Sequence, residues 1–295
     1  MNILITGSSG LVGTHLGKVM EAEGHNIIRM LRSAPDGQPF CWLPDKGVIN
    51  YDDSVDIDAV INLAGESIAD GRWSEERKRR ILDSRVSGTR LLAETLAKQK
   101  SKPKVFISGS AIGFYGETGA SIVDEDSKQG TGYLAEVAEL WEHAAKPAAD
   151  AGIRTVNIRT GVVLSPDGGM LQKLLLPFKM GLGGIVGNGQ QYISWVSIND
   201  MAGMIQFLLE NDTISGAINL VSKQPVTNYT FTKTLGSVLK RPTIFPLPGC
   251  VARVVFGEMA DALLLSSIRV QPKRLIEEGY NFIDTDLEKT LRSLL

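Results

Sequence analysis

The sequence predicts an α/β fold with a doubly wound parallel sheet that helices cover on both faces. Short apolar runs, typical of buried strands, alternate with helical patterns along the first half of the chain. A glycine-rich turn follows the first of these runs. Because parallel neighbouring strands need a crossover connection, this alternation is typical of a sheet between two helical layers.

The elements can be placed in order by their hydrophobic periodicity. Strands are predicted at 2–6, 26–31, 58–63, 104–109 and 154–159, with helices between them at about 11–23, 74–99 and 131–150. Beyond residue 160 glycine and proline are more frequent, and helices are expected at 200–210, 228–239, 258–265 and 285–294. We therefore predict a nucleotide-binding domain over 1–163, joined by about 193–220, and a smaller substrate-binding region over 164–192 and 221–295.

The composition excludes several classes of function. The 295 residues are 43% hydrophobic and carry a net charge of −2, so no overall field draws the chain to nucleic acid or to an anionic membrane. A small-molecule substrate fits better. Two cysteines and three histidines have no metal-ligand or disulfide spacing, and no metal is expected. With no signal-peptide pattern and no apolar run of roughly 20 residues, we expect a cytoplasmic protein.

The glycine-rich segment TGSSGLVG (6–13) stands between the first strand and the first helix. Gly7, Gly10 and Gly13 permit a tight turn and a close approach of the backbone to a pyrophosphate at the helix N-terminus. Ser9, Leu11 and Val12 lie between these glycines and share the predicted contact. An ordinary strand-to-helix loop is the alternative, but the position at the head of a βαβ pattern favours a Rossmann-like dinucleotide site.

The end of the second strand indicates the kind of dinucleotide. It reads Leu31, Arg32 and Ser33, with no acidic residue before Asp36. An acid at this position binds the ribose of NAD, whereas an arginine accommodates the 2′-phosphate of NADP. The guanidinium of Arg32 suits a phosphate, so NADP(H) is the predicted cofactor. The alternative is a solvated arginine at the end of a strand.

Two further segments could complete the cofactor site. The strand at 58–63 continues into NLAGE, where Leu63 is followed by Ala64 and Gly65, which are small enough to admit a flat ring at the edge of the sheet. A strand followed by a tight turn is the plainer interpretation. The basic segment RWSEERKRRILDSR (72–85) is mostly a solvated face, from which Arg80 and Arg85 are the predicted cofactor contacts.

The chemistry is expected near SGSAIGFYG (108–116), which leaves the carboxyl end of a strand, where ligands bind in open α/β sheets. Ser108, Ser110 and Tyr115 could bind a substrate oxygen there. A serine in a turn more often bonds its own backbone. In the following cover segment GLGGIVGNGQQ (181–191) and beyond it, Gln191 and Trp195 are candidate substrate contacts, or else a surface glutamine and a core tryptophan.

Tyr133 opens GYLAEVAELWE (132–142), and the residue four positions on is Val137. In a Tyr-x-x-x-Lys pair the lysine favours the phenolate, so without it Tyr133 could only donate a proton as a neutral phenol, which favours reduction. The alternative is an aromatic residue in the first helical turn that packs on the core.

Together these motifs resemble the short-chain dehydrogenase/reductase superfamily of the extended type, and within it the atypical epimerase-family proteins with a distinctive C-terminal domain. The segments that carry the resemblance are TGSSGLVG, LRS, NLAGE, SGSAIGFYG, IRTGVVLS, SWVSIND and VQPKRL. The resemblance implies a C-terminal region that binds substrate and partly returns to the sheet. It also implies cofactor contacts at Gly7, Gly10, Gly13, Leu31, Arg32, Leu63, Ala64, Arg80, Arg85 and Val163.

The sequence leads to two hypotheses about function. The first is an NADP(H)-dependent oxidoreductase or epimerase that acts on a small polar molecule through Ser110, Tyr133 or Tyr115. The second is a catalytically silent NADP(H)-binding sensor or regulatory protein. The oligomeric state stays open, with a homodimer as one candidate.

Overall fold

The central sheet contains six parallel strands in the order β12-β8-β6-β5-β1-β2. The computed structural model describes residues 1–32 and 39–295. In chain order these strands are β1 (Asn2–Thr6), β2 (Asn26–Met30), β5 (Ala59–Asn62), β6 (Val105–Ala111), β8 (Arg154–Thr160) and β12 (Gly216–Leu220). Ile3 lies opposite Ile27 of β2 on one side and Ala59 of β5 on the other. The predicted fold class, a Rossmann-like parallel sheet, is confirmed.

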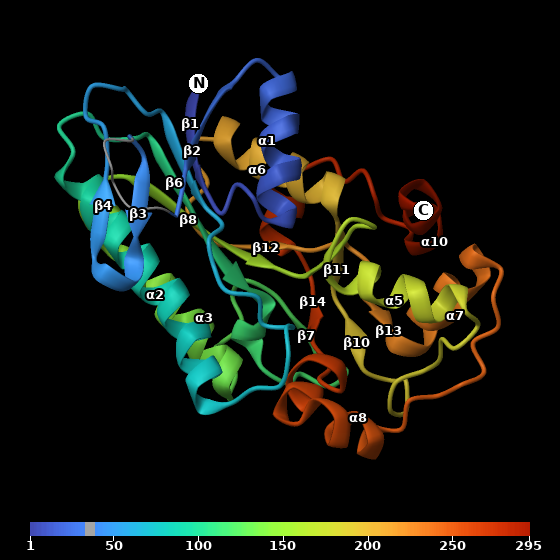
Figure 1. Cartoon of the computed structure of the whole chain (residues 1–295). Helices are drawn as coiled ribbons and strands as arrows, with labels where there is room; N and C mark the ends of the chain where they lie inside the picture. Colours follow the sequence, from blue (N-terminus) through green and yellow to red (C-terminus); the bar gives the residue numbers. More distant parts are fainter. Residues whose placement is uncertain (33–38) are drawn as a thin grey trace.

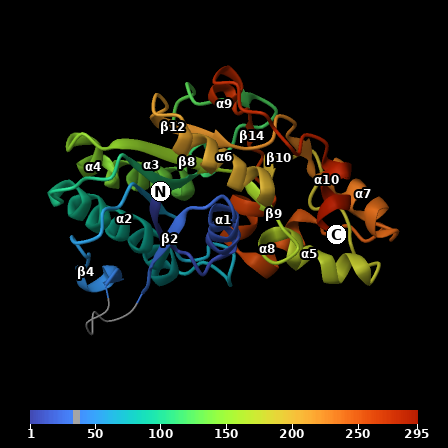
Figure 2. The ribbon, with the colours of Figure 1, turned by 90° about the horizontal axis from the view of Figure 1, so that it is seen from above.

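Helices cover both faces of this sheet (Figures 1 and 2). One layer consists of α1 (Leu11–Ala22) and α6 (Ile198–Glu210), the other of α2 (Glu75–Lys98), α3 (Tyr133–Ala144) and α4 (Lys146–Asp150). Alternate residues of each strand point to opposite faces. Ile3 and Ile5 therefore pack with Leu16 of α1, whereas Leu4 packs with Leu92 of α2.

The helix predicted at 131–150 is in fact two helices, because Pro147 has no N–H to continue the first. Ala145 caps α3, and Pro147 lies in the first turn of α4. A short antiparallel hairpin of β3 (Cys41–Leu43) and β4 (Val48–Asn50), which the sequence pattern does not predict, follows β2 at the edge of the sheet.

The C-terminal region lies beside the carboxyl ends of the strands (Figure 1). Its helices are α5 (Gly169–Lys179), α7 (Asn228–Leu239), α8 (Gly249–Phe256), α9 (Lys273–Glu277) and α10 (Leu287–Leu294). A separate core holds much of it together, in which Leu171 and Phe178 of α5 pack with Trp195, Phe231 and Leu291. The helix predicted at 258–265 is only a π-helical turn over Ala260–Leu264, and α8 before it is not predicted.

The described residues also form four two-stranded sheets, one of which is the β3–β4 hairpin. The other three pair β9 (Val162–Leu164) with β11 (Trp195–Ser197), β10 (Tyr192–Ile193) with β13 (Val226–Thr227), and β7 (Ile122–Val123) with β14 (Arg269–Val270). The last pair ties a segment far along the chain to the loop after β6. Among the described residues, we find no helix with the length and apolarity that a bilayer crossing requires.

Candidate functional site

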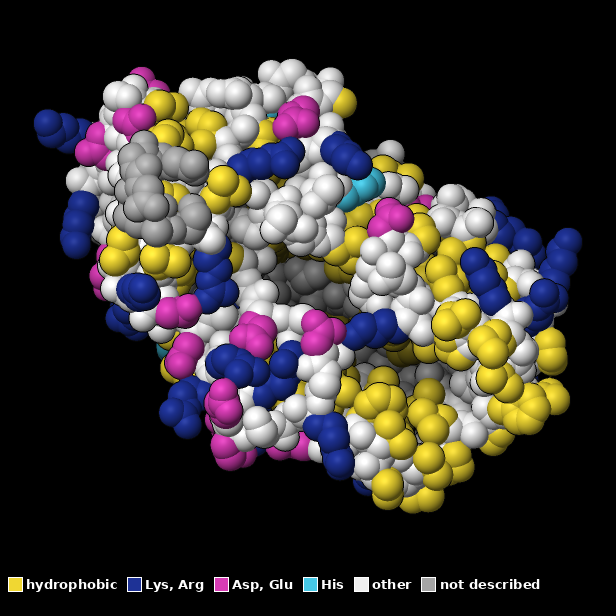
Figure 3. All heavy atoms as spheres, viewed as in Figure 1, with side chains coloured by type: hydrophobic (Ala, Val, Ile, Leu, Met, Phe, Trp, Pro, Cys, Tyr) yellow, Lys and Arg dark blue, Asp and Glu magenta, His cyan; other side chains and the backbone are white. Residues whose placement is uncertain are grey.

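A cavity of about 590 Å³ lies between the carboxyl ends of the parallel strands and the C-terminal region. The space-filling view is hollowed there (Figure 3). Its wall combines the glycine-rich turn, the end of β6, the inner face of α3, and residues of α5 and the π-helical turn. Segments more than 250 residues apart in sequence thus meet at the edge of the sheet where α/β proteins bind ligands.

The glycine-rich turn is shaped by two close backbone contacts. Gly7 has a φ of +66°, and a Cβ atom there would lie 2.7 Å from the carbonyl carbon of Leu63. A Cβ on Gly13 would lie 2.3 Å from the carbonyl oxygen of Gly7. Both positions therefore require glycine, and the turn leaves the N-terminus of α1 beside the cavity. Such a terminus favours an anion.

Eight of the residues predicted to contact a cofactor line this cavity: Gly7, Gly10, Leu11, Val12, Gly13, Leu63, Gly65 and Arg85. Arg85 is half-buried, and its Nη1 donates a hydrogen bond of 3.1 Å to the carbonyl of Ile81. Its guanidinium also lies 5.1 Å from the ring centroid of Trp141. Burial lowers the pKa of Arg85 to about 10, so the side chain stays charged at neutral pH.

The other predicted cofactor residues lie outside the cavity wall. Arg32 forms an ion pair with Asp45 at the end of β2, where both side chains are exposed. Arg80 pairs with Glu66 and Glu76. Ser9 and Leu31 are exposed, Ala64 packs against the core under α2, and Ser33 lies outside the described residues.

Val163 and Ser108 face away from the cavity into the protein. Val163 packs against the core beneath α1, and the strand alternation presents its neighbour Val162 to the cavity instead. The hydroxyl of Ser108 is fully buried and has no hydrogen-bond partner among the described residues.

Ser110 is the predicted catalytic residue that reaches the cavity. Its Oγ donates a 2.7 Å hydrogen bond to Oε1 of Glu142, on the last turn of α3. Arg159 of β8 binds the same carboxylate with both of its ends, Nε to Oε1 at 2.8 Å and Nη2 to Oε2 at 3.0 Å. The hydroxyl is therefore held by a bidentate ion pair, and its lone pairs are left for a ligand.

This ion pair is buried, with 6% of the Arg159 side chain and 13% of the Glu142 side chain exposed. Burial opposes the charge on Arg159, but the bonds to Glu142 and Tyr115 outweigh it and raise the Arg159 pKa. Glu142 also borders a second cavity, whose wall includes the charged residues Lys146, Arg154 and Asp212. The carboxylate therefore stands between Ser110 and a polar space beside α4 and the start of β8.

Tyr115 belongs to the same network but lies behind the cavity wall. Its hydroxyl accepts a 3.0 Å hydrogen bond from Nη1 of Arg159 and donates one of 2.7 Å to Oδ1 of Asn219. Burial raises the pKa of Tyr115 to about 12, so it stays a neutral phenol. Tyr115 therefore holds Arg159 in place and does not line the cavity.

Tyr133 is also outside the cavity wall. Its hydroxyl donates a 2.6 Å hydrogen bond to the carbonyl of Lys78, and its ring packs edge-on against Trp73 at 5.3 Å. Burial raises the pKa of Tyr133. The cavity face of α3 is formed instead by Leu134, Val137, Ala138 and Trp141. These contacts favour the alternative interpretation of Tyr133 as a packing residue of the first helical turn.

The loop over 181–191 does line the cavity, and it is anchored to the segment before α8. The amide of Gly187 donates to the carbonyl of Leu247 at 2.9 Å, and the amide of Leu247 donates to the carbonyl of Ile185 at 2.8 Å. Gln191 is buried in the cavity wall and is not a surface residue. Trp195 is fully buried in the C-terminal core, so the expectation of a substrate contact there is wrong and the core alternative holds.

Sequence reasoning missed Glu142 and Arg159 as functional candidates. One signal was available for Arg159, because a charged residue near the end of a strand of the central sheet must find a partner where it is buried. The partner itself could not be read from the sequence. Within residues 1–32 and 39–295, no cluster of histidine, cysteine or carboxylate side chains is arranged to hold a metal.

A parallel sheet whose first turn is glycine-rich and faces a cavity at the strand ends defines a Rossmann-like protein of the short-chain dehydrogenase type. The chain belongs to the NAD dependent epimerase/dehydratase family, whose model matches residues 3–220. Residues 247–294 match a second model, a domain of unknown function (DUF1731). The distinctive C-terminal domain that the sequence implies is thereby confirmed.

Relatives extend over nearly the whole chain. Epimerase family protein Mb2239 of Mycobacterium bovis is 41% identical over 281 residues, which are 95% of this chain and 93% of that protein. Human epimerase family protein SDR39U1 is 33% identical over 303 residues and is covered over 100% of both chains. The crystal structure of human SDR39U1 (isoform 2) with NADPH superposes with a TM-score of 0.90 at 32% identity, covering 100% of this chain and 99% of that one.

Proposed function

We propose that this protein binds NADP(H) at the glycine-rich turn and is an oxidoreductase or epimerase of the extended, atypical short-chain dehydrogenase type. The shape of the turn supports the cofactor, because Gly7 and Gly13 permit a tight backbone turn in which any Cβ would clash with neighbouring backbone, and α1 begins at the cavity. The human relative that was crystallised with NADPH, at 32% identity over the full chain, points the same way.

Arg32 is the proposed selector of the 2′-phosphate. It stands at the end of β2, and its present partner Asp45 is an exposed side chain. An exposed ion pair contributes only about 0–1 kcal/mol, whereas a charge-assisted contact to phosphate contributes about 1.5–3 kcal/mol. A phosphate can therefore displace the carboxylate.

In the proposed reaction Ser110 contacts the oxygen of the substrate. When bound, the nicotinamide supplies or accepts a hydride at the carbon that carries this oxygen. The Ser110 hydroxyl relays a proton from a substrate hydroxyl to the Glu142 carboxylate in oxidation. In reduction Glu142 first takes a proton from solvent through the second cavity, and the Ser110 hydroxyl relays it to the substrate oxygen. Glu142 is the acid–base group of this relay, Arg159 positions its carboxylate, and Tyr115 fixes Arg159. The single observation that carries this proposal is the Ser110–Glu142–Arg159 arrangement at the cavity.

The cofactor preference is tested by titrating NADPH and NADH into purified protein. We expect NADPH to bind tighter by roughly tenfold to a hundredfold, and Arg32→Ala to remove most of that difference. Arg29→Ala is the matched control, because Arg29 is an exposed arginine of the same strand that pairs with Glu21. Equal affinities for the two nucleotides in the native protein would contradict the assignment.

The second candidate is a catalytically silent NADP(H)-binding sensor. The observation that favours it is Val137, buried in the cavity wall at the position where a catalytic lysine would follow Tyr133. The cytoplasmic location, the small-molecule substrate and the domain boundaries also stay predictions. So does a homodimer, which sedimentation velocity of the purified protein would reveal as a species of twice the chain mass.

A further inference from the structure

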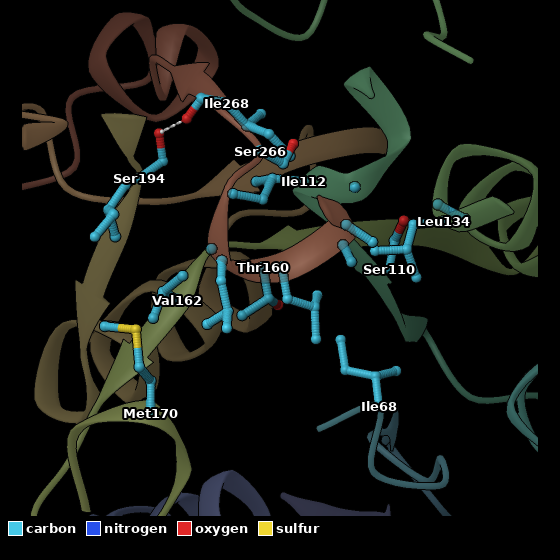
Figure 4. A pocket seen from close by; sticks show the side chains of 18 of the residues that line it. Ile68, Ser110, Ile112, Leu134, Thr160, Val162, Met170, Ser194, Ser266 and Ile268 are labelled. Carbon is cyan, nitrogen blue, oxygen red and sulfur yellow. Dashed lines mark hydrogen bonds between the residues drawn. The ribbon is translucent and has the colours of Figure 1, made fainter. Parts of the chain in front are cut away.

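The cavity wall beyond the glycine-rich turn is built from uncharged side chains (Figure 4). Ile68, Leu134, Met170 and Ile268 surround the open space, and most of what they present is hydrocarbon. Among the described residues that line the cavity, Arg85 alone is charged. A Cβ on Gly65 would lie 3.3 Å from Cζ of Arg85, so this charge sits on the side of the turn after β5.

Two polar side chains in the C-terminal part of the wall, Ser194 and Gln191, are bonded within the protein. Ser194 Oγ donates to the carbonyl of Ile268 and accepts from the amide of Val270, both at 2.8 Å. Gln191 Nε2 donates to the carbonyls of Val186 and Leu264, both at 3.0 Å. These bonds hold the wall together. The polar groups that remain for the reacting oxygen of a substrate are neutral hydroxyls such as that of Ser110.

We infer that the substrate is a neutral and mainly apolar carbonyl compound or alcohol, in place of the small polar molecule that the sequence suggests. The inference rests on the proposed function, since it concerns the substrate of the same cavity. A carboxylate or a diphosphate would lose its hydration on entering, and no cation lines the C-terminal part of the described wall to replace it. An alkyl or aryl group loses unfavourable hydration there instead.

Calorimetric binding to the NADP⁺-loaded protein tests this class directly. Methyl alkyl ketones from butanone to decanone are compared with the same ketones whose terminal methyl is replaced by a carboxylate, and with UDP-glucose. The ketone and NADP⁺ are both in their oxidised forms and cannot react with each other, so calorimetry measures binding without turnover. We expect the best neutral ketone to bind at least tenfold more tightly than its carboxylate and than UDP-glucose. Equal or tighter binding of either anion, or no binding of any ketone, overturns the inference.

Two leucines of α5 provide a matched pair of variants. Leu174 lines the cavity, whereas Leu176, two residues on, is 68% exposed. Leu174→Lys should reverse the preference in favour of the carboxylate, and Leu176→Lys should leave it unchanged. Ile68→Lys, in the loop before α2, places the same charge at another point of the cavity wall if Leu174→Lys does not fold. A neutral preference that persists in a folded cavity variant overturns the inference.

Failure of the proposed function gives a different result. In that case the ketones still bind with the expected preference, but NADPH is not oxidised when it replaces NADP⁺ in the same mixtures. Oxidation of NADPH by a charged carbonyl compound, with no neutral one accepted, contradicts the substrate class and leaves the proposed function standing.

Discussion

In the proposed reaction Ser110 transfers the proton, so that no lysine is needed four residues after Tyr133. Short-chain dehydrogenases with Tyr-x-x-x-Lys use the lysine to make a phenol acidic, whereas here a hydroxyl is bonded to a carboxylate that Arg159 holds at both oxygens. A buried ion pair contributes little net stability, because desolvation offsets the attraction. Its evident effect is to fix the direction of one hydrogen bond at the cavity.

This role predicts unequal effects of two conservative substitutions. Ser110→Ala should lower kcat by about 10²-fold, because general acid–base assistance is typically worth 10²–10⁴-fold. Tyr133→Phe removes a hydroxyl that donates to the Lys78 carbonyl outside the cavity, so kcat should fall by no more than a few-fold. Steady-state kinetics on an accepted ketone measure both. A large loss in Tyr133→Phe with an unchanged Ser110→Ala would restore the tyrosine as proton donor.

The carboxylate of Glu142 should matter for stability as well as for turnover. Glu142→Gln leaves Arg159 buried without its counter-charge, and breaking such a pair costs about 3–5 kcal/mol in the free energy of unfolding. Glu288→Gln, which breaks the exposed pair with Arg292 on α10, should cost less than about 1 kcal/mol. Urea denaturation of the three proteins tests the contrast, and similar losses in both variants would show that burial does not set the cost.

At the scale of elements, the sequence predicted those whose signals are local. Five strands of the sheet follow from apolar runs and the turn at 6–13 follows from its glycines, whereas the strand β12 was not predicted. The helix α5, which contains Pro177, was missed because packing against the C-terminal core overrides a weak local pattern. The break at Pro147 was missed although its signal, a proline without an N–H, is local. Ser110, by contrast, could be predicted as a candidate site residue because it lies at the carboxyl end of a strand.

The first turn of α1 allows a sharp test of the cofactor site. Gly13→Ala would place a methyl group 2.3 Å from the Gly7 carbonyl oxygen, so the turn must open and NADPH affinity should fall by at least tenfold, about 1.4 kcal/mol. Gly17→Ala is the control, because a Cβ there has no heavy atom within 4 Å and alanine suits a helix interior. Calorimetry gives the two affinities, and circular dichroism confirms that both variants are folded. Undiminished binding in Gly13→Ala would place the nucleotide elsewhere.

At the scale of the whole molecule, the site depends on contacts that no local pattern specifies. The turn after β1, the helix α5 and Ile268 all line the cavity. Glu142 of α3 binds Arg159 of β8. These pairings arise from the strand order β12-β8-β6-β5-β1-β2, which places the carboxyl ends of β6 and β8 side by side. The sequence could therefore predict the kind of site and the side of the sheet, but not the partners of its residues.

Transfer of deuterium from NADPH labelled at C4 is the most direct measurement of the central claim, that this protein moves a hydride between NADP(H) and a carbon next to Ser110. Samples labelled on either face of the ring are incubated with the neutral ketones, and the alcohol is analysed by mass spectrometry. We predict one deuterium on the carbinol carbon from one of the two labelled samples, with a loss of about 10²-fold in rate in Ser110→Ala. Stoichiometric NADPH binding with no deuterium in any product would contradict this claim and identify a nucleotide-binding sensor.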